Sequence, residues 1–281
     1  MIIYDTEILK AIPPFKKKDR LPDTSYCKGW TDFKNMGIAC IGAHLSDVGY
    51  IIFEEKEFFY YDYDGENFVL LFEVSTEDSP RFSTGFDFFL EQVNQEKSRG
   101  EKLIGFNSIS FDDKLLKATG YEVDTDIDLL CEVRLSTNQP PFYDPTLTKG
   151  GYSLNDLAIA NGLGNKSMTG AIAPIEWQKG NKEAVRQYCL KDVYITRELF
   201  LADQLTDPTN KNLIQINKEG RKYLFTQDSP GSFIEEIPNL SSLDELLNAF
   251  YYSERFKKQL EQSKKDLEET KKKLKNFLIK W

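Results

Sequence analysis

The first eight residues constrain the fold most strongly, because they place two acids on one side of an otherwise apolar segment. Ile2, Ile3 and Tyr4 form an apolar run without helical periodicity, which is typical of a buried central strand. Side chains two positions apart on a strand share a face, so Asp5 and Glu7 point the same way, with Cα atoms roughly 7 Å apart. Burying unpaired carboxylates is costly, so the pair indicates either an edge strand with solvated acids or a cation site.

The composition is that of an ordinary globular protein. The chain has 281 residues, 40% of them hydrophobic, and a formal net charge of −9. That length predicts one large domain, or one domain with an appendage. Basic residues outnumber acidic ones from residue 253 onward, whereas the preceding body is acidic. Because an acidic body repels phosphates, any contact with nucleic acid has to be local.

The cysteines and the single histidine exclude several kinds of site. The four cysteines lack C-x-x-C spacing, which predicts reduced thiols and no zinc signature (Cys27, Cys40, Cys131 and Cys189). His44 is the only histidine, so a catalytic triad or a metal site with histidine ligands would have to use this one residue, for which a structural or surface role is expected instead. Carboxylates must then bind any metal, and oxygen-only sites select hard cations such as Mg²⁺ or Mn²⁺.

No apolar run reaches membrane-spanning length, and the N-terminal residues lack the features of a secretory signal. We therefore expect a cytoplasmic protein with no membrane contact. After the first strand, Lys10 to Trp30 contains three prolines and the run Lys16-Lys17-Lys18, which predicts an exposed loop. Its lysines form either a solvated tip or an arm that contacts phosphates.

Apolar patterns predict an α/β layer fold with strands early in the chain and helices in its second half. Strands are expected over 36–45, 49–53 and 103–106, with a hairpin of 58–61 and 68–72 around Asp64-Gly65. Helices are expected over 86–95, 111–118 and 182–205, and another after the N-cap Ser153. The segment 127–130 fits either a strand or the start of a helix.

Three parts are expected along the chain: a body over 1–205, a linker or cover segment over 206–240, and a basic amphipathic helix over 241–281. Apolar residues recur every seven positions in the last part (Leu260, Leu267, Leu274 and Trp281). Polar residues interrupt the second seam of this repeat. We therefore expect the helix to dock on the body or on a protein partner, or to mediate self-association.

Two later stretches supply further acids. The segment from Asn107 to Phe111 and Asp112 puts an acid in the first turn of a helix that follows a buried strand, where the helix dipole favours negative charge. Tyr188 and Asp192 are four residues apart and so share one face of the last helix. Two carboxylates about 5 Å apart repel by roughly 3 kcal/mol at an effective dielectric near 20. A cluster of all four acids therefore predicts raised pKa values or bound cations.

These motifs resemble those of a known family. Asp5-x-Glu7, Asn107-x-x-x-Phe111-Asp112 and Tyr188-x-x-x-Asp192 occur in the order typical of the DEDD superfamily of 3′–5′ exonucleases. Gln187 stands where the histidine branch of that family has its histidine, so the tyrosine branch is indicated. The resemblance covers about residues 1–205 and implies a ribonuclease H-like fold, a mixed sheet flanked by helices.

The resemblance also implies functional roles for individual residues. It implies two Mg²⁺ or Mn²⁺ ions with four carboxylate ligands: Asp5, Glu7, Asp112 and Asp192. Tyr188 would orient the attacking water. The substrate would be the 3′ end of a single strand of nucleic acid, with DNA favoured, and the residues expected to contact it are Thr6, Asn107, Phe111 and Lys166.

Alternatives remain open for both the site and the function. Asp113 competes with Asp112 as the ligand, and Asp126 and Asp128 are expected to be structural or to support the ligands. Phe106 or Phe111 could stack on a terminal base, or either could belong to the core. A ribonuclease H-like module of replication or repair that binds nucleic acid or a partner without cutting is the main functional alternative. A resolvase-type endonuclease is the third.

Overall fold

The computed structural model describes residues 1–78, 82–166 and 168–220. The chain divides into a first unit of residues 1–133 and 150–223 and a second unit of residues 134–149 and 224–281. The first unit holds a mixed sheet with helices against it, so the α/β class is confirmed. The helix expected over 241–281 lies outside the described residues.

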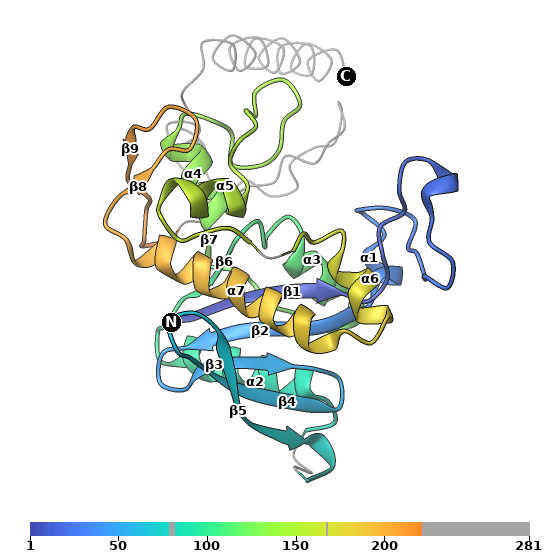
Figure 1. Ribbon diagram of the computed structural model, residues 1–281. Coiled ribbons are helices and arrows are strands. Elements are labelled where there is room, and N and C mark those ends of the chain that lie inside the picture. The colour runs from blue at the N-terminus through green and yellow to red at the C-terminus, as the bar shows by residue number, and fades with distance from the viewer. Residues whose placement is uncertain (79–81, 167, 221–281) are drawn as a thin grey trace, which may run out of the picture. The chain divides into compact units, whose positions relative to one another are not determined.

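Seven strands form the sheet, in the order β5-β4-β3-β2-β1-β6-β7 (Figure 1). Their bounds are β1 Ile2–Ile8, β2 Ile38–Leu45, β3 Gly49–Phe53, β4 Glu57–Tyr63, β5 Phe68–Ser75, β6 Leu103–Gly105 and β7 Ile127–Asp128. β1 pairs antiparallel with β2 and parallel with β6, which pairs parallel with β7. Because β1 and β6 run in parallel, residues that follow their carboxyl ends meet at one edge of the sheet.

The helices of the described residues are α1 Phe33–Met36, α2 Gly85–Ser98, α3 Asp112–Thr119, α4 Leu129–Ser136, α5 Leu154–Ala160, α6 Ala173–Gln178 and α7 Lys182–Leu201. α7 packs across β1 and β2 on one face (Figure 1). α2 packs on β3 and α3 on β2. None of the helices in the described part is long and apolar enough to cross a membrane.

The alternation of side chains along β1 divides the core into two layers. Ile3 packs with the residues of α7, whereas Ile2 and Tyr4 pack with those of α2 and α3. Because Asp5 and Glu7 have the parity of Ile3, they belong to the layer under α7. The strand is therefore interior, and the edge-strand alternative for its two acids is wrong.

A glycine lets α7 approach the sheet closely. Gly42 of β2 lies opposite Asp5 in the ladder. A Cβ atom at Gly42 would lie 2.7 Å from the Sγ atom of Cys189 on α7, closer than packed atoms can lie. The missing side chain thus brings α7 down onto the acids of β1.

Most of the expected elements are present. The strands, the hairpin around Asp64-Gly65, the capping box of Ser153 with Asp156, and the helices near 86–95 and 111–118 are confirmed. The segment 127–130, for which a strand and the start of a helix were both open, contains the two in turn: β7 ends at Asp128 and α4 begins at Leu129. α6 was not among the expected helices. The helix expected over 182–205 ends at Leu201.

The segment after α7 covers part of the core. β8 (Leu205–Thr206) pairs antiparallel with β9 (Leu213–Ile214) in a separate small sheet. Ile214 and Ile216 are buried in the same core cluster as residues of α5 and α7. The part of the 206–240 segment that the structure describes, up to residue 220, therefore packs as a cover.

His44 has a structural role inside β2. Its ring lies 4.7 Å from that of Tyr50, and its side chain is nearly buried, so the surface alternative is wrong. Burial, followed by the nearby positive charge of Arg197, lowers the pKa of His44 to about 4. The imidazole is therefore neutral at physiological pH.

Candidate functional site

The two acids of β1 form the centre of a carboxylate cluster under α7. One oxygen from each of Asp5 and Glu7 and the Sγ atom of Cys189 all lie within 4.8 Å of one another. Glu7 is buried and Asp5 is partly exposed. Burial, followed by repulsion from neighbouring acids, raises the pKa of both carboxyls well above their ordinary values. At neutral pH the cluster therefore needs protons or cations to be stable.

Asp112 joins this cluster from the first turn of α3. Its Oδ1 atom accepts hydrogen bonds from the backbone N–H of Thr6, at 3.2 Å, and from the Thr6 hydroxyl. Burial raises the pKa of Asp112 to about 7, although these hydrogen bonds oppose the shift. The charge of Asp112 is in turn the largest electrostatic cause of the raised pKa of Asp5. Thr6 thus orients Asp112, and the structure does not test its predicted contact with substrate.

Asp192 of α7 is the fourth acid, and one of its oxygens has no partner. Its Oδ2 atom lies 2.5 Å from the Nζ atom of Lys166. Its Oδ1 atom is buried and has no hydrogen-bond partner among the described residues. Burial raises the pKa of Asp192 to about 6, and the charge of Lys166 opposes this shift. A buried carboxylate oxygen without a donor is unusual and suits a cation ligand.

Lys166 supplies a positive charge inside the cluster. Its Nζ atom lies 4.8 Å from the centroid of the Tyr188 ring, and its backbone N–H donates to Asn155. Its charge lowers the pKa values of Asp5 and Glu7, although burial and repulsion outweigh this effect. The structure pairs Lys166 with an acid of the cluster and does not test its predicted contact with substrate.

Tyr188 lies on the same face of α7 as Asp192 and is 2% exposed. Burial, followed by the charges of Asp192, Glu7 and Asp5, raises the pKa of its phenol. The hydroxyl is therefore neutral and can both donate and accept a hydrogen bond at physiological pH.

The other nearby acids have structural partners. Asp113 accepts hydrogen bonds from the hydroxyls of Tyr4 and Thr125 and from the backbone N–H of Thr125, so it fixes α3 against β1. Asp126 accepts from the backbone N–H of Leu103, at 2.8 Å. Asp128 is buried and accepts four backbone N–H bonds, from Asn107, Ile109, Leu130 and Cys131. These partners favour Asp112 over Asp113 as the acid of the cluster.

Two of the expected substrate residues lie on the β6–α3 connection, which leads into the cluster acid Asp112. Asn107 adopts a left-handed conformation, with φ 63°, at the turn that ends β6. Phe111 immediately precedes Asp112, and its ring lies 5.7 Å from that of Phe33 and 6.1 Å from that of Trp30. Phe106 packs against the core under α7. Of the two phenylalanines considered for stacking, Phe111 therefore has the aromatic neighbours.

Sequence reasoning missed two residues here. Cys189 is three positions before Asp192 and so shares its helix face, a spacing that could have drawn attention to it. Trp30 is 55% exposed and contacts Phe111, which is 81 positions later, so no local signal could have found it.

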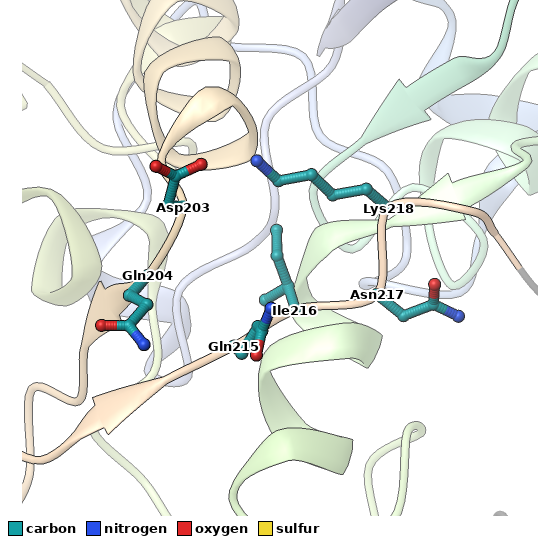
Figure 2. A pocket seen from close by; sticks show the side chains of 6 residues that line it. All are labelled: Asp203, Gln204, Gln215, Ile216, Asn217 and Lys218. Atoms are coloured by element: carbon teal, nitrogen blue, oxygen red, sulfur yellow. The ribbon is translucent and has the colours of Figure 1, made fainter.

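A separate pocket lies beyond the C-terminal end of α7 (Figure 2). Its lining comprises Asp203, Gln204, Gln215, Ile216, Asn217 and Lys218. Of the six lining residues labelled in Figure 2, Asp203 and Lys218 are charged, and Lys218 donates to the carbonyl of Leu201. The pocket shares no residue with the carboxylate cluster.

Neither the protein-family models nor the curated proteins compared with this chain gave a match. The function of the chain therefore has to be inferred from the chemistry of the cluster. Four acids from β1, α3 and α7 interact electrostatically, and a neutral phenol lies beside them. Such a site can bind cations and orient a polar substrate group.

Proposed function

We propose that this chain is a metal-dependent 3′–5′ exonuclease that hydrolyses phosphodiester bonds at the 3′ end of a single strand, with DNA the first substrate to test. The observation that carries the proposal is the close approach of the carboxylates of Asp5 and Glu7 beside the phenol of Tyr188. The charges of Asp112 and Asp192 add to burial in raising the pKa of Asp5, and the charges of Asp5 and Asp192 do so for Glu7. The mixed sheet flanked by helices is compatible with the ribonuclease H-like fold that the motifs imply.

The donor set suits hard divalent cations. When no cation is bound, the carboxylates of a cation site have raised pKa values and oxygens without partners. Asp5 and Glu7 have raised pKa values, and the Oδ1 atom of Asp192 has no partner among the described residues. Burial also raises the pKa of the Cys189 thiol, so the thiol stays protonated and is a poor ligand. Oxygen ligands from the acids then favour Mg²⁺ or Mn²⁺ over zinc.

Each residue of the cluster has a distinct part in this proposal. The four carboxylates would hold the cations, which lower the pKa of the attacking water and stabilise the departing oxygen. Thr6 keeps Asp112 in position through two hydrogen bonds. The neutral hydroxyl of Tyr188 orients the water by hydrogen bonding. Lys166, which pairs with Asp192, would supply a positive charge for a phosphate oxygen of the substrate.

One observation favours a second candidate, a nucleic-acid-binding or partner-binding module that does not cut. The ammonium group of Lys166 already neutralises part of the cluster through its ion pair with Asp192. A permanent internal cation of this kind could replace a metal ion and leave a structural site. The two candidates differ in whether nucleotides are released.

The test is degradation of single-stranded DNA and RNA, labelled at either end, with Mg²⁺ or Mn²⁺. Wild type is compared with Asp5→Asn and with Glu122→Gln, which changes an exposed acid outside the cluster. We expect the wild type and Glu122→Gln to shorten 5′-labelled strands stepwise, and Asp5→Asn to leave them intact. If the wild type binds the oligonucleotides and cuts none of them, the exonuclease proposal is wrong and the protein is a binding module.

A further inference from the structure

The loop from Lys10 to Trp30, which follows the carboxyl end of β1, combines exposed cations and exposed apolar side chains. Phe15 is fully exposed, Leu21 is 43% exposed and Trp30 is 55% exposed. Lys16 and Arg20 are exposed between them. Basic residues outnumber acidic ones in this loop, whereas the chain as a whole carries a net charge of −9. The loop is thus a local basic surface on an acidic protein.

The base of the loop is firmly attached to the helix that precedes α7. The side-chain amide of Gln178 in α6 donates to the carbonyls of Leu9 and Ser25 at 2.9 and 3.1 Å, and its oxygen accepts from the N–H of Ser25 at 2.6 Å. Ala11 also pairs with Tyr26 across the base of the loop. The loop therefore emerges from a fixed point near the elements that carry the acids, as Figure 1 shows beside α1 and α6.

The tip of the loop is folded back by Tyr26. The Tyr26 hydroxyl accepts a hydrogen bond from the N–H of Leu21 at 2.9 Å, and the guanidinium of Arg20 lies 5.2 Å from the centroid of its ring. These contacts give the exposed cations a defined position. A preordered basic surface loses less conformational entropy when it binds.

Trp30 connects the loop to the cluster. Its ring meets that of Phe111 edge to face, at 6.1 Å and 66°, and Phe111 immediately precedes the cluster acid Asp112. More than half of the Trp30 side chain is exposed and can receive a flat apolar partner. Nucleic-acid bases stack on exposed aromatic rings in this way, and cations beside such rings bind the phosphates.

We propose that the Lys10–Trp30 loop is a binding arm for single-stranded nucleic acid, in which Trp30 stacks on a base near the 3′ end and Lys16, Lys18 and Arg20 contact phosphates farther along the strand. This inference rests on the proposed function and specifies its substrate, a single strand long enough to reach from the carboxylate cluster to the arm. Contacts between cations and phosphates weaken as the salt concentration rises, whereas stacking on Trp30 should not, so the two contributions to binding can be measured separately.

The test measures binding by full-length protein that carries Asp5→Asn, so that the strand is not degraded. The probe is a fluorescein-labelled single-stranded oligodeoxynucleotide of about 12 nucleotides, titrated over a range of salt concentrations. Trp30→Ala should weaken binding roughly 5- to 150-fold without changing the salt slope. Changing Lys16, Lys18 and Arg20 to Gln should reduce the slope of log affinity against log salt by about 2, or 0.7 for each phosphate contact.

Matched controls change exposed residues of the same kinds elsewhere. Phe72→Ala removes an exposed aromatic ring on β5, and a triple Gln variant removes three exposed lysines (Lys56, Lys102 and Lys211). The proposal is supported if only the arm variants change binding. It is overturned if the arm variants bind like the controls. In that case the exonuclease proposal still stands wherever the cutting assay supports it, because cutting is measured on a protein with an intact arm.

Discussion

Replacing Asp112 by Asn should stabilise the protein, by an amount that grows with pH. Burial raises the pKa of Asp112 to about 7. Between about pH 5 and pH 7 the native carboxyl keeps a proton that the unfolded chain has already lost. Stability falls as pH rises wherever the native state binds more protons. The wild type should therefore lose stability over this range, and the Asp112→Asn variant, which does not titrate there, should escape that loss.

The expected size follows from the width of the window. Each pH unit is worth about 1.4 kcal/mol, so the two units from about pH 5 to pH 7 amount to about 3 kcal/mol for this one group. The Asn side chain keeps an oxygen that can accept the hydrogen bonds of Thr6. For a folded region of about this size, this change means that the variant's advantage in melting temperature over the wild type should be roughly 6–12 °C larger at pH 8 than at pH 5.

The assay is urea unfolding with chelator present, for wild type and variant at about pH 5 and pH 8. Asp47→Asn is the matched control, because Asp47 is 79% exposed and outside the cluster. We expect the Asp112→Asn difference to grow with pH and the Asp47→Asn difference to stay constant. A constant difference for Asp112→Asn would refute the reasoning, since it would mean that the carboxyl titrates alike in both states. Saturating Mg²⁺ should reverse the order, because the cation then stabilises the ionised wild type.

Three further predictions follow from the same geometry. Mn²⁺ at 100 times its dissociation constant should stabilise the wild type by about 2.7 kcal/mol, and thermal melting should show no such shift for Asp5→Asn. Gly42→Ala should cost about 1–3 kcal/mol in urea unfolding, because its Cβ would lie 2.7 Å from the Cys189 Sγ atom, and Cys189→Ala should recover much of that loss. The pKa of His44 is about 4 in the folded protein and about 6.5 in the unfolded chain, so the unfolded chain takes up a proton first as pH falls. The free energy of unfolding should therefore decrease by about 3 kcal/mol between pH 6.5 and pH 4 because of this one residue. His44→Gln should remove that part of the acid sensitivity, and an unchanged pH profile would contradict it.

The short-range features of the chain were predictable from the sequence. The parity of Asp5 and Glu7 follows from the two-residue period of a strand, and the shared face of Tyr188 and Asp192 follows from the helical period. The capping box at Ser153 and the hairpin turn at Asp64-Gly65 depend on interactions within a few residues. The sequence alone therefore determined the α/β class and the five residues on which the functional proposal rests.

The tertiary structure decided what those residues touch. Only the packing of α7 over Gly42 shows that Cys189 lies among the acids. Only the folded chain pairs Lys166 with Asp192, leaves one Asp192 oxygen unpartnered, and puts Trp30 against Phe111. The reason is physical: strand and helix periods fix which way a side chain points, whereas contacts between residues far apart in sequence depend on how the elements pack.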